Sequence, residues 1–474
     1  MQTIRIMDPV TRIEGHLKVE ITMDSVNGSN EVVDARCTGT LFRGFEELLK
    51  GRDTKDATVI TQRICGVCPI SHGQASVLAL EAVSGWKAQG NARYLRNISL
   101  GANFVQSHIL HFYLLAALDY VAGPNASPWT PAWNVDMRSG LAGISAHIAD
   151  AVEARRRAHE LGALVGGRMP TSHTFIPGGF SGGPNSSKIS QAKAEVDWLL
   201  NFIRNTYLPD VQALAAAYDD YYGVGEGCGN LMAYGVFETD DQYQGRLLAR
   251  GYKEKGGSVR SGLQTEDITE SVTYSWYSDA TEGLHPAQGD TEPQFPKGDA
   301  YSWLKAPRLL GEPFEAGPLA RMTVNGDYAN GVSVMDRHVA RAREALKIAS
   351  AMKSWLGQLD GGSVYDTAYR QQSGMGVGLT EAPRGALGHW VEVGGGRVAN
   401  YQVITPTCWN ASPRDGGSVP GPMEQALIGT PVADPDRPVE ALRVIHSFDP
   451  CLSCAVHMMK PGKPPVVVHT GGGC

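Results

Sequence analysis

Residues 62–69 read QRICGVCP, and a second pair of cysteines with the same spacing stands near the other end of the chain, in DPCLSCAVH at residues 449–457. A CxxC pair places two thiolates on one turn, so that both can bind one metal ion. Four-cysteine zinc modules usually have their pairs about 15–20 residues apart. Pairs at opposite ends of a 474-residue chain therefore favour metal chemistry inside a large core, with a structural zinc site as the alternative.

The composition is that of a large globular protein. Hydrophobic residues make up 42% and charged residues 19%, which excludes disordered and low-complexity classes and leaves little charge for the surface. We therefore expect a partner to cover part of that surface. The net charge is −7 and the longest basic run is Arg155–Arg157, so nucleic acid is not an expected ligand.

The remaining cysteines and the N-terminal residues argue against a disulfide-rich secreted protein. Eight cysteines are too few for a disulfide scaffold in a chain of this length, and we expect the solitary Cys37, Cys228 and Cys408 to be small buried residues. The opening MQTIRIMDPVTRIEGH contains no apolar segment. We therefore expect no secretory signal in this chain, although a partner's signal could export it.

Hydrophobic periodicity predicts a helix-rich α+β fold. Alternation over residues 4–33 predicts an N-terminal hairpin or small sheet, and it returns at 390–404. Helical spacing and proline placement predict four long helices: 91–121, 139–165, 188–222 with a bend or break at Pro209, and 334–356. The first of these is expected to be a buried core helix rather than a membrane span, because it contains the polar residues Asn103, Gln106, Ser107, His108 and His111. Its two histidines should form core hydrogen bonds, with metal binding as the less favoured alternative.

These elements predict one composite domain, 1–457, with a central bundle of long helices and peripheral β-sheet layers. Residues 225–330 are rich in glycine, proline and aromatic residues and should form an elaborated layer of loops and sheet. The last 17 residues, 458–474, contain three prolines and four glycines, so they have little capacity to form a regular packed element.

The two cysteine signatures closely resemble RxCGxC and DPCxxCxxH of the large subunit of nickel-iron hydrogenases of the uptake or respiratory type. Five further stretches match in order: DPVTRIEGH near residue 10, FRGFE near 42, HFYLLAALDYV near 111, EAPRGAL near 381 and TCWNASPRD near 407. Several of them are similar to the nickel-iron-selenium subgroup. That subgroup carries selenocysteine at the position of Cys451, so selenium chemistry is not implied here.

The resemblance implies reversible oxidation of dihydrogen to protons and electrons at a buried nickel-iron centre. Cys65 and Cys451 would be terminal nickel ligands, and Cys68 and Cys454 would bridge to an iron that carries carbon monoxide and cyanide. Soft thiolates suit nickel, and an open coordination position would receive dihydrogen. A terminal thiolate also stays basic, so Cys451 could accept a proton.

Further residues match the family's catalytic positions. Glu14 matches the proton-relay glutamate, although from propensity alone it would be an ordinary strand-end residue. Arg384 matches the arginine above the open metal site, where a fixed planar cation could polarise dihydrogen or orient a base. Asp119 and Asp449 match the carboxylates that hold this arginine, and charge compensation of a buried arginine is their simpler role.

A second metal site is also implied. Glu46, the carbonyl of Val403 and His457 match a magnesium or similar site with oxygen-rich coordination. Pro406 and Thr407 match positions beside the diatomic ligands of the iron.

Three further residues near the first cysteine pair or on the first long helix also match the hydrogenase family. Val67 and Leu118 match the narrow end of a gas channel, with simple core packing as an equally good reading. His72 should form a hydrogen bond near Cys68. The motif Gly167–Pro170 is followed by His173 rather than directly by a histidine as in many relatives, which leaves its contact with the partner's nearest cluster open.

The chain has too few cysteines for an iron-sulfur relay of its own. The resemblance therefore implies an iron-sulfur small subunit that forms a heterodimer or larger assembly with it. It also implies a maturation endopeptidase that removes residues 458–474, and a place in the periplasm or at a membrane through the partner, with the cytoplasm as the alternative. A dihydrogen sensor and a non-catalytic subunit of a respiratory complex share this fold. Sensors lack the tail, and the respiratory subunit has lost the cysteine pairs.

Overall fold

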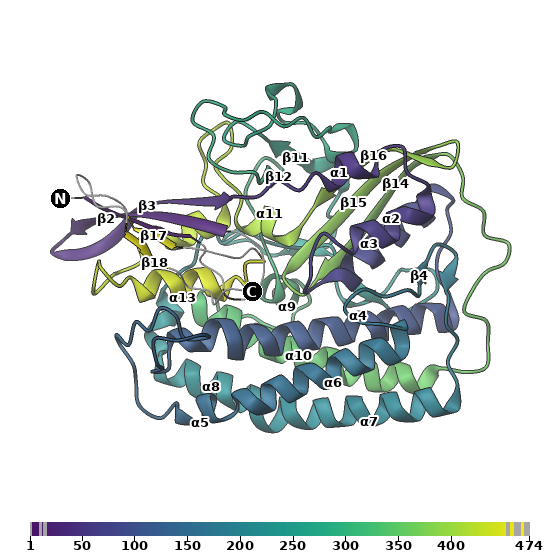
Figure 1. Cartoon of the computed structure of the whole chain (residues 1–474), viewed down its shortest axis with the longest axis horizontal. Helices are drawn as coiled ribbons and strands as arrows, with labels where there is room; N and C mark the ends of the chain where they lie inside the picture. Colours follow the sequence, from purple (N-terminus) through teal and green to yellow (C-terminus); the bar gives the residue numbers. More distant parts are fainter. Residues whose placement is uncertain (1, 9–11, 13–16, 452–455, 459–465, 469–474) are drawn as a thin grey trace.

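The computed structural model describes every residue except 1, 9–11, 13–16, 452–455, 459–465 and 469–474. Long helices lie together in one layer, and the β-sheets and loops lie above it (Figure 1). This is the helix-rich α+β architecture that the periodicity predicts. The long helices are α4 (Gly90–His111), α6 (Ile148–Gly166), α7 (Ser186–Phe202), α8 (Leu208–Ala217) and α10 (Val334–Gln358).

Helix α4 is buried along almost its whole length. Beyond His111 the chain continues as a π-turn, Phe112–Ala116, and a 3₁₀ turn, Ala117–Asp119. The predicted helix 91–121 is therefore correct in position, but its last turns depart from α geometry. Single π-turns within helices often occur at functional sites because they change the direction of the side chains that follow.

Of the predicted bend or break at Pro209, the break is not observed, but the helical geometry changes just before this residue. Pro209 lies in the first turn of α8, and the irregularity is the π-turn Ile203–Tyr207 that joins α7 to α8. Proline lacks an N–H and fits the first helical turn. The chain therefore runs through this region with one π-turn instead of a break.

The N-terminal sheet is confirmed. Strands β1 (Thr3–Met7), β2 (Leu17–Val26) and β3 (Ser29–Gly39) are antiparallel in sequence order. The turn between β2 and β3 has positive φ at Asn27 and Gly28, at 50° and 87°, which is the geometry of a tight hairpin turn.

A second antiparallel sheet packs beside α3 (Pro69–Val83). It consists of β14 (Gly374–Ala382), β15 (Gly385–Gly394) and β16 (Arg397–Ile404). Alternation predicted the last two strands but neither β14 nor α3. At Gly376 and Gly378 of β14 an added Cβ would lie 2.1 and 2.0 Å from carbonyl oxygens of α3. Strand and helix backbones are therefore in direct contact, which only glycine permits.

Residues 225–330 form the predicted layer of loops and short strands, with one α-helix, α9 (Pro318–Val324), that the sequence did not indicate. Its strands are β6 (Leu231–Ala233), β7 (Val236–Glu238), β8 (Arg246–Leu248), β9 (Gly251–Lys253), β10 (Val259–Arg260), β11 (Ile268–Ser271), β12 (Ala306–Leu309) and β13 (Glu315–Ala316).

Shorter elements complete the chain. They are α1 (Phe45–Leu49), α2 (Thr54–Thr61), α5 (Ala142–Ala146), β4 (Phe175–Ile176), β5 (Gly179–Phe180), α11 (Pro406–Asn410), α12 (Pro422–Leu427) and α13 (Val439–Ser447). Among the residues described, no helix combines the length and apolar character needed to cross a bilayer.

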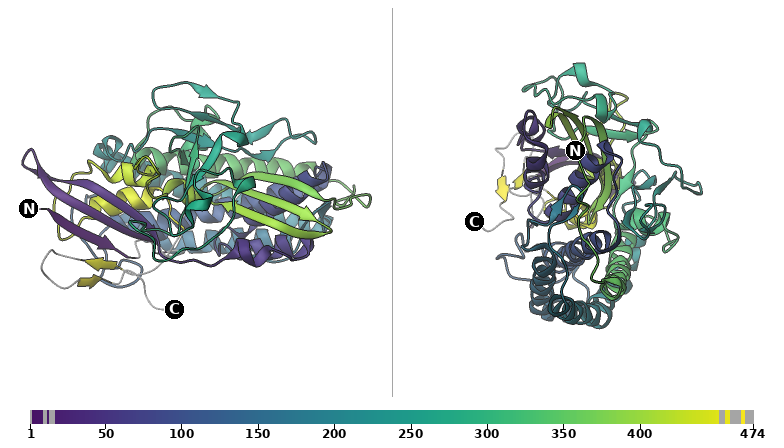
Figure 2. Two further views of the ribbon diagram at one scale, coloured as in Figure 1. Left: turned by 90° about the horizontal axis from the view of Figure 1, so that it is seen from above. Right: turned by 90° about the vertical axis from the view of Figure 1, so that its right-hand side faces the viewer.

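The end of the chain forms a hairpin. Strand β17 (Val456–Met458) pairs with β18 (Val466–Val468), with His457 opposite Val467. Strand β17 lies beside β1, as the view from above in Figure 2 shows. The strand that follows the second cysteine pair therefore lies against the first strand of the chain. The domain limits 1–457 and 458–474 stay predictions.

Candidate metal centre

The first CxxC lies in the loop between α2 and α3. The main-chain N–H of Cys68 donates to the sulfur of Cys65, at 3.2 Å. The carbonyl of Val67 accepts hydrogen bonds from Asn103 Nδ2 (2.8 Å) and Gln106 Nε2 (3.0 Å) of α4. Two polar residues that interrupt the apolar face of α4 therefore hold the loop that carries both thiols.

The second CxxC follows α13. Asp449 has a positive φ of 57°, a conformation that aspartate tolerates better than most residues, and the chain turns there toward the first pair. The sulfur of Cys451 lies 3.2 Å from that of Cys65. The sulfurs of Cys65, Cys68 and Cys451 all lie within 4.8 Å of one another. Cys454 lies outside the described residues.

The three thiols cannot all ionise without a cation. Hydrogen bonds from Cys451 and Cys68 lower the pKa of Cys65 well below its ordinary value, whereas contact with Cys65 raises the pKa of Cys451. Contacts with Cys451 and Cys65 likewise raise the pKa of Cys68. One thiolate thus suppresses the others. A soft metal ion would relieve this repulsion, so these residues fit the metal that the sequence predicts.

Arg384 lies at the same place. Its Nε donates to the carbonyl of Asp449 (3.1 Å), and its Nη2 lies 3.1 Å from Asp449 Oδ1. The side chain is 1% exposed, and neither Nη1 nor Nη2 forms a hydrogen bond to a described residue. Burial raises the pKa of Asp449 to about 6, against the lowering effect of Arg384 and Arg341. The arginine therefore keeps N–H groups for a ligand in the cavity.

Asp119 does not hold Arg384, which corrects the sequence-based expectation. Its Oδ1 lies 2.7 Å from Arg12 Nη2, and its Oδ2 contacts His446 Nδ1. Asp119 lies in the 3₁₀ turn that follows the π-turn after α4. There it meets the segment of Arg12 and helix α13.

One cavity of about 210 Å³ connects these groups. Several predicted site residues line it: Glu46, Cys65, Cys68, His72, Arg384, Val403, Pro406, Thr407 and Cys451. The hydroxyl of Thr407 accepts a hydrogen bond from the N–H of Cys451, at 3.4 Å. The structure therefore gathers into one cavity residues from five separate stretches of the sequence.

His72, expected to form a hydrogen bond near Cys68, pairs with another histidine. Its Nδ1 lies 3.1 Å from Nε2 of His389, and no hydrogen bond to Cys68 is found among the described contacts. Nδ1 of His389 lies 2.7 Å from the hydroxyl of Tyr401. Burial lowers the pKa of His72 to about 4. His72 is therefore a neutral histidine, and His389 and Tyr401 orient its ring. Nothing in the sequence indicated that these residues would meet.

The surroundings of Glu46 bear on the second metal site. Its Oε1 accepts from the N–H of Val403 (2.8 Å), and its Oε2 accepts from the hydroxyl of Thr291. Lys305 lies nearby, 3.3 Å from Glu270. Burial lowers the pKa of Lys305, but Glu270 and Glu46 raise it above its ordinary value. The positive charge of Lys305 therefore partly compensates the negative charges of Glu46 and Glu270 at this end of the cavity.

The remaining predicted site residues and the histidines of α4 have different outcomes. Glu14 and the side chain of His457 lie outside the described residues. Core hydrogen bonds are confirmed for His108 with Glu344 (2.8 Å) and for His111 with the carbonyl of His446 (2.6 Å).

The solitary cysteines and the channel positions complete this comparison. Cys37 is buried as expected, but Cys228 and Cys408 are half-buried. Val67 and Leu118 pack against the core, and a gas channel there stays a prediction.

Comparison with known proteins decides the family. Residues 43–138, 130–333 and 326–457 match the nickel-dependent hydrogenase family, and residues 3–38 match a HoxL-like family. The chain belongs to the nickel-dependent hydrogenase family. It is thus the large subunit of a hydrogenase, an oxidoreductase that acts on dihydrogen. The family implies nickel and iron in the active site and a small subunit as partner.

Individual relatives match over nearly the whole chain. The periplasmic [NiFeSe] hydrogenase large subunit of Desulfomicrobium baculatum is 39% identical over 96% of this chain and 94% of its own. The uptake hydrogenase large subunit of Bradyrhizobium diazoefficiens is 33% identical over 96% and 95%. A solved structure of the D. baculatum [NiFeSe] hydrogenase matches with a TM-score of 0.90 and 40% identity, over 95% of this chain and 99% of that one.

Proposed function

We propose that this hydrogenase binds its nickel-iron centre through both CxxC pairs, with Cys65 and Cys451 as terminal nickel ligands and Cys68 and Cys454 as bridges to iron. The convergence of three of these sulfurs within 4.8 Å, in one cavity with Arg384, is the observation that carries the proposal. Structural zinc does not need a buried arginine with unpaired N–H groups beside its ligands.

When bound, the nickel-iron centre, with carbon monoxide and cyanide on its iron, supplies heterolytic cleavage of dihydrogen. Arg384 places a fixed planar cation in the cavity, where it can polarise dihydrogen or orient a base. Cys451 can accept the proton because a terminal thiolate ligand stays basic. Glu14 then passes the proton toward the surface.

The same cavity would hold a second metal, magnesium or a similar divalent cation. Its ligands would be Glu46, the carbonyl of Val403 and His457, with water in the other positions. The hydrogen bond from the N–H of Val403 to Glu46, 2.8 Å long, supports this by bringing the first two residues together. Pro406 and Thr407 line the cavity and would contact the diatomic ligands of the iron.

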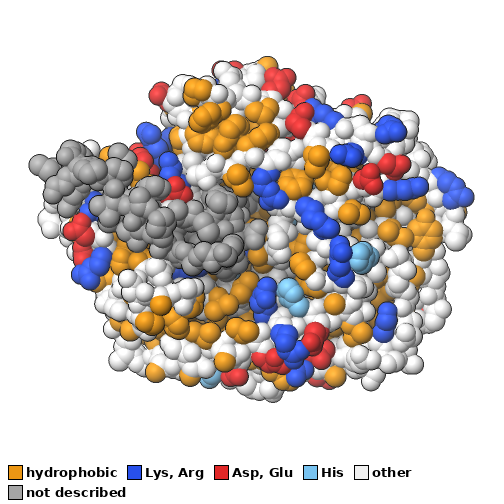
Figure 3. All heavy atoms as spheres, viewed as in Figure 1, with side chains coloured by type: hydrophobic (Ala, Val, Ile, Leu, Met, Phe, Trp, Pro, Cys, Tyr) orange, Lys and Arg blue, Asp and Glu red, His pale blue; other side chains and the backbone are white. Residues whose placement is uncertain are grey.

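We further propose that electrons leave through an iron-sulfur small subunit. Figure 3 shows groups of hydrophobic side chains on the face seen in Figure 1, with lysines and arginines between them. Such a mixed surface suits a large protein interface. By analogy with the relatives, the assembly would be periplasmic or held at a membrane by the partner, with a cytoplasmic location as the alternative.

Metal analysis of the purified heterodimer tests the proposal. We expect nickel, with iron in excess of nickel because the clusters of the partner also contain iron, and nickel lost in the Cys65→Ala variant. A matched control is Cys37→Ala, because Cys37 is buried in another part of the core. Zinc in place of nickel, or unchanged nickel in Cys65→Ala, would contradict the assignment.

A further inference from the structure

Arg321 of α9 is a fully buried cation that binds the turn carrying Arg384. Its Nη1 donates to the carbonyl of Ala382 at 3.0 Å, and its Nη2 donates to the carbonyl of Pro383 at 2.8 Å. These two residues directly precede Arg384, where β14 turns into β15. One guanidinium therefore holds the main chain that presents Arg384 to the cavity.

Two carboxylates hold Arg321 in turn, and both are fully buried. Glu344 of α10 accepts from Nε at 2.6 Å and from Nη2 at 2.7 Å, and Glu381 of β14 accepts from Nη1 at 2.8 Å. Burial raises the pKa of Glu344, but Arg321 and His108 lower it to about 2, so this pair stays charged at neutral pH. With the two carbonyls, every N–H group of the Arg321 guanidinium has an acceptor. Its orientation is therefore fixed.

The same turn packs directly against the start of α9. Gly317, just before the helix, has a positive φ of 139°, and an added Cβ there would lie 3.1 Å from the carbonyl oxygen of Arg384. An added Cβ at Gly385 would lie 2.9 Å from the main-chain carbonyl carbon of Ala316. Helix α9 therefore contacts the turn at its own N-terminus and again, one helical turn later, through Arg321.

The side chain of Arg384 is held separately from its main chain. Its guanidinium contacts Asp449 and keeps N–H groups without a hydrogen bond to a described residue. A group that acts on a bound reactant must be held precisely, because a displacement of about 1 Å can remove most of its effect. We propose that Arg321 is a positioning residue, which fixes the main chain of Arg384 and thereby the place of its guanidinium in the cavity. This inference rests on the function proposed above.

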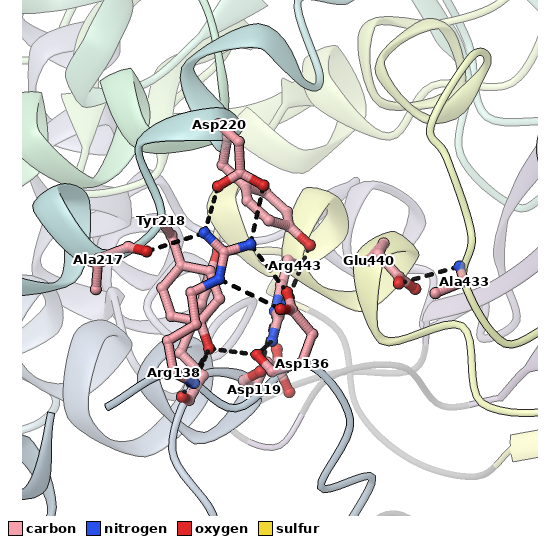
Figure 4. Close-up of polar contacts among 11 residues, drawn as sticks. Asp119, Asp136, Arg138, Ala217, Tyr218, Asp220, Ala433, Glu440 and Arg443 are labelled. Atoms are coloured by element: carbon pink, nitrogen blue, oxygen red, sulfur yellow. Dashed lines mark hydrogen bonds and ion pairs between the residues drawn. The ribbon is translucent and has the colours of Figure 1, made fainter. Parts of the chain in front are cut away.

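Buried arginines that bind a carboxylate and a main-chain carbonyl also occur elsewhere in the core. Figure 4 shows Arg443 of α13, whose Nη1 donates to Asp136 at 2.8 Å and whose Nε donates to the carbonyl of Asp119 at 3.0 Å. Helix α13 leads to the second cysteine pair. A change at Arg443 would therefore act on the segment before Cys451, so this residue does not serve as a control.

Arg96 of α4 is the matched control. Its Nη1 and Nη2 donate to the two carboxylate oxygens of Glu81, at 2.9 and 2.6 Å, and both side chains are 1% exposed. Its Nη2 also donates to the carbonyls of Ile176 at 3.0 Å and Gly179 at 2.7 Å. Arg96 thus has the same kinds of partner as Arg321, and none of these residues is among the described residues that line the metal cavity.

The test compares Arg321→Lys, Arg96→Lys, Arg384→Lys and the double variant Arg321→Lys/Arg384→Lys in the assembled heterodimer. Lysine keeps the charge but loses the planar fork, so Arg321→Lys and Arg96→Lys should both lower the midpoint of thermal unfolding. Arg321→Lys should retain nickel and lower dihydrogen oxidation at least about tenfold, whereas Arg96→Lys should stay within about twofold of wild type.

Two further measurements separate positioning from a general loss of stability. Amide hydrogen exchange in peptides that span residues 379–388 should become at least about tenfold faster in Arg321→Lys and stay unchanged in Arg96→Lys. The double variant should oxidise dihydrogen within about twofold of Arg384→Lys alone, because Arg321 acts only through Arg384.

Four results would overturn the inference: undiminished turnover in Arg321→Lys, unchanged exchange at the turn, an equal loss of turnover in Arg96→Lys, and multiplied losses in the double variant. If Arg321→Lys fails to assemble, Glu344→Gln decides by the same measurements, since it keeps Arg321 and removes the charge that orients it. Near-normal turnover in Arg384→Lys would instead refute the proposed role of Arg384, and the inference with it.

Discussion

At the residue scale, the central feature is the buried guanidinium of Arg384, which pairs with Asp449 and keeps N–H groups without a hydrogen bond to a described residue, beside three thiols in contact. We predict that Arg384→Lys keeps the metal content but lowers dihydrogen oxidation at least about tenfold, because an ammonium cannot present two coplanar N–H groups. Arg308→Lys is the control, since Arg308 is also buried and paired with an aspartate, Asp415, at 2.7 Å. Near-normal turnover in Arg384→Lys would reduce this residue to a counter-ion.

A second residue-scale prediction concerns pH. Glu424 is fully buried; burial raises its pKa to about 7, although its Oε1 accepts from the N–H of Cys37 and the hydroxyl of Tyr301. A carboxyl with a raised folded-state pKa stabilises the fold at low pH. This stabilisation decreases from about pH 4.3, the unfolded value, to about pH 7.

Glu424→Gln should therefore gain thermal stability relative to wild type as pH rises over this window, because the amide never ionises. The difference should level off above about pH 7. Calorimetry of the heterodimer at several pH values measures it, with the exposed Glu392→Gln as control. A difference between Glu424→Gln and wild type that does not change with pH would contradict the expected titration.

At the element scale, hydrophobic periodicity predicted the helices and strands that pack through their side chains. It missed the strand that packs through its backbone. Helices α4 and α10 and strands β15 and β16 carry regular apolar patterns, and their positions were predicted. The bounds of α10 were close, whereas α4 ends ten residues before the predicted 121 and β15 begins five residues before the predicted 390. Strand β14 was missed because glycines replace side chains where it contacts α3. The π-turns were missed because a single π-turn inside a helical run barely changes the apolar spacing from which the helix is predicted.

The contact between β14 and α3 gives an element-scale prediction. Gly378→Ala should destabilise the chain by at least about 2 kcal/mol, because the new methyl would lie 2.0 Å from the carbonyl oxygen of Ala75. Gly394→Ala, at the end of β15, has no atom within 4 Å of the new methyl and should change stability by no more than about 0.5 kcal/mol. Equal stabilities in denaturant titration would contradict the direct backbone contact.

At the scale of the whole molecule, the sequence predicted which residues meet but not all of their partners. The motifs brought Cys65, Cys451, Arg384 and Thr407 to one cavity, as the structure confirms. They assigned Asp119 to the wrong arginine, because a motif records residue types and not the direction in which a π-turn points them. The pairing of His72 with His389 was missed for the same reason, since neither position signals the other.

The end of the chain gives a whole-molecule prediction. We expect the mature protein to end at His457, with 458–474 removed after nickel insertion. The bond after His457 lies within β17, which pairs with β18, so cleavage would separate the tail from the strand that holds it. Intact mass spectrometry of active enzyme measures this, with chain produced without nickel as the full-length control. Full activity in a chain that still ends at Cys474 would refute processing.

The most direct test of the account is infrared spectroscopy of the assembled wild-type heterodimer. A nickel-iron centre held by cysteines from both ends of the chain should give carbon monoxide and cyanide stretching bands, and Cys451→Ser should lose or shift them, because a hard alkoxide replaces a soft thiolate. Wild-type protein that is fully assembled with its partner and shows neither kind of band would contradict the nickel-iron assignment.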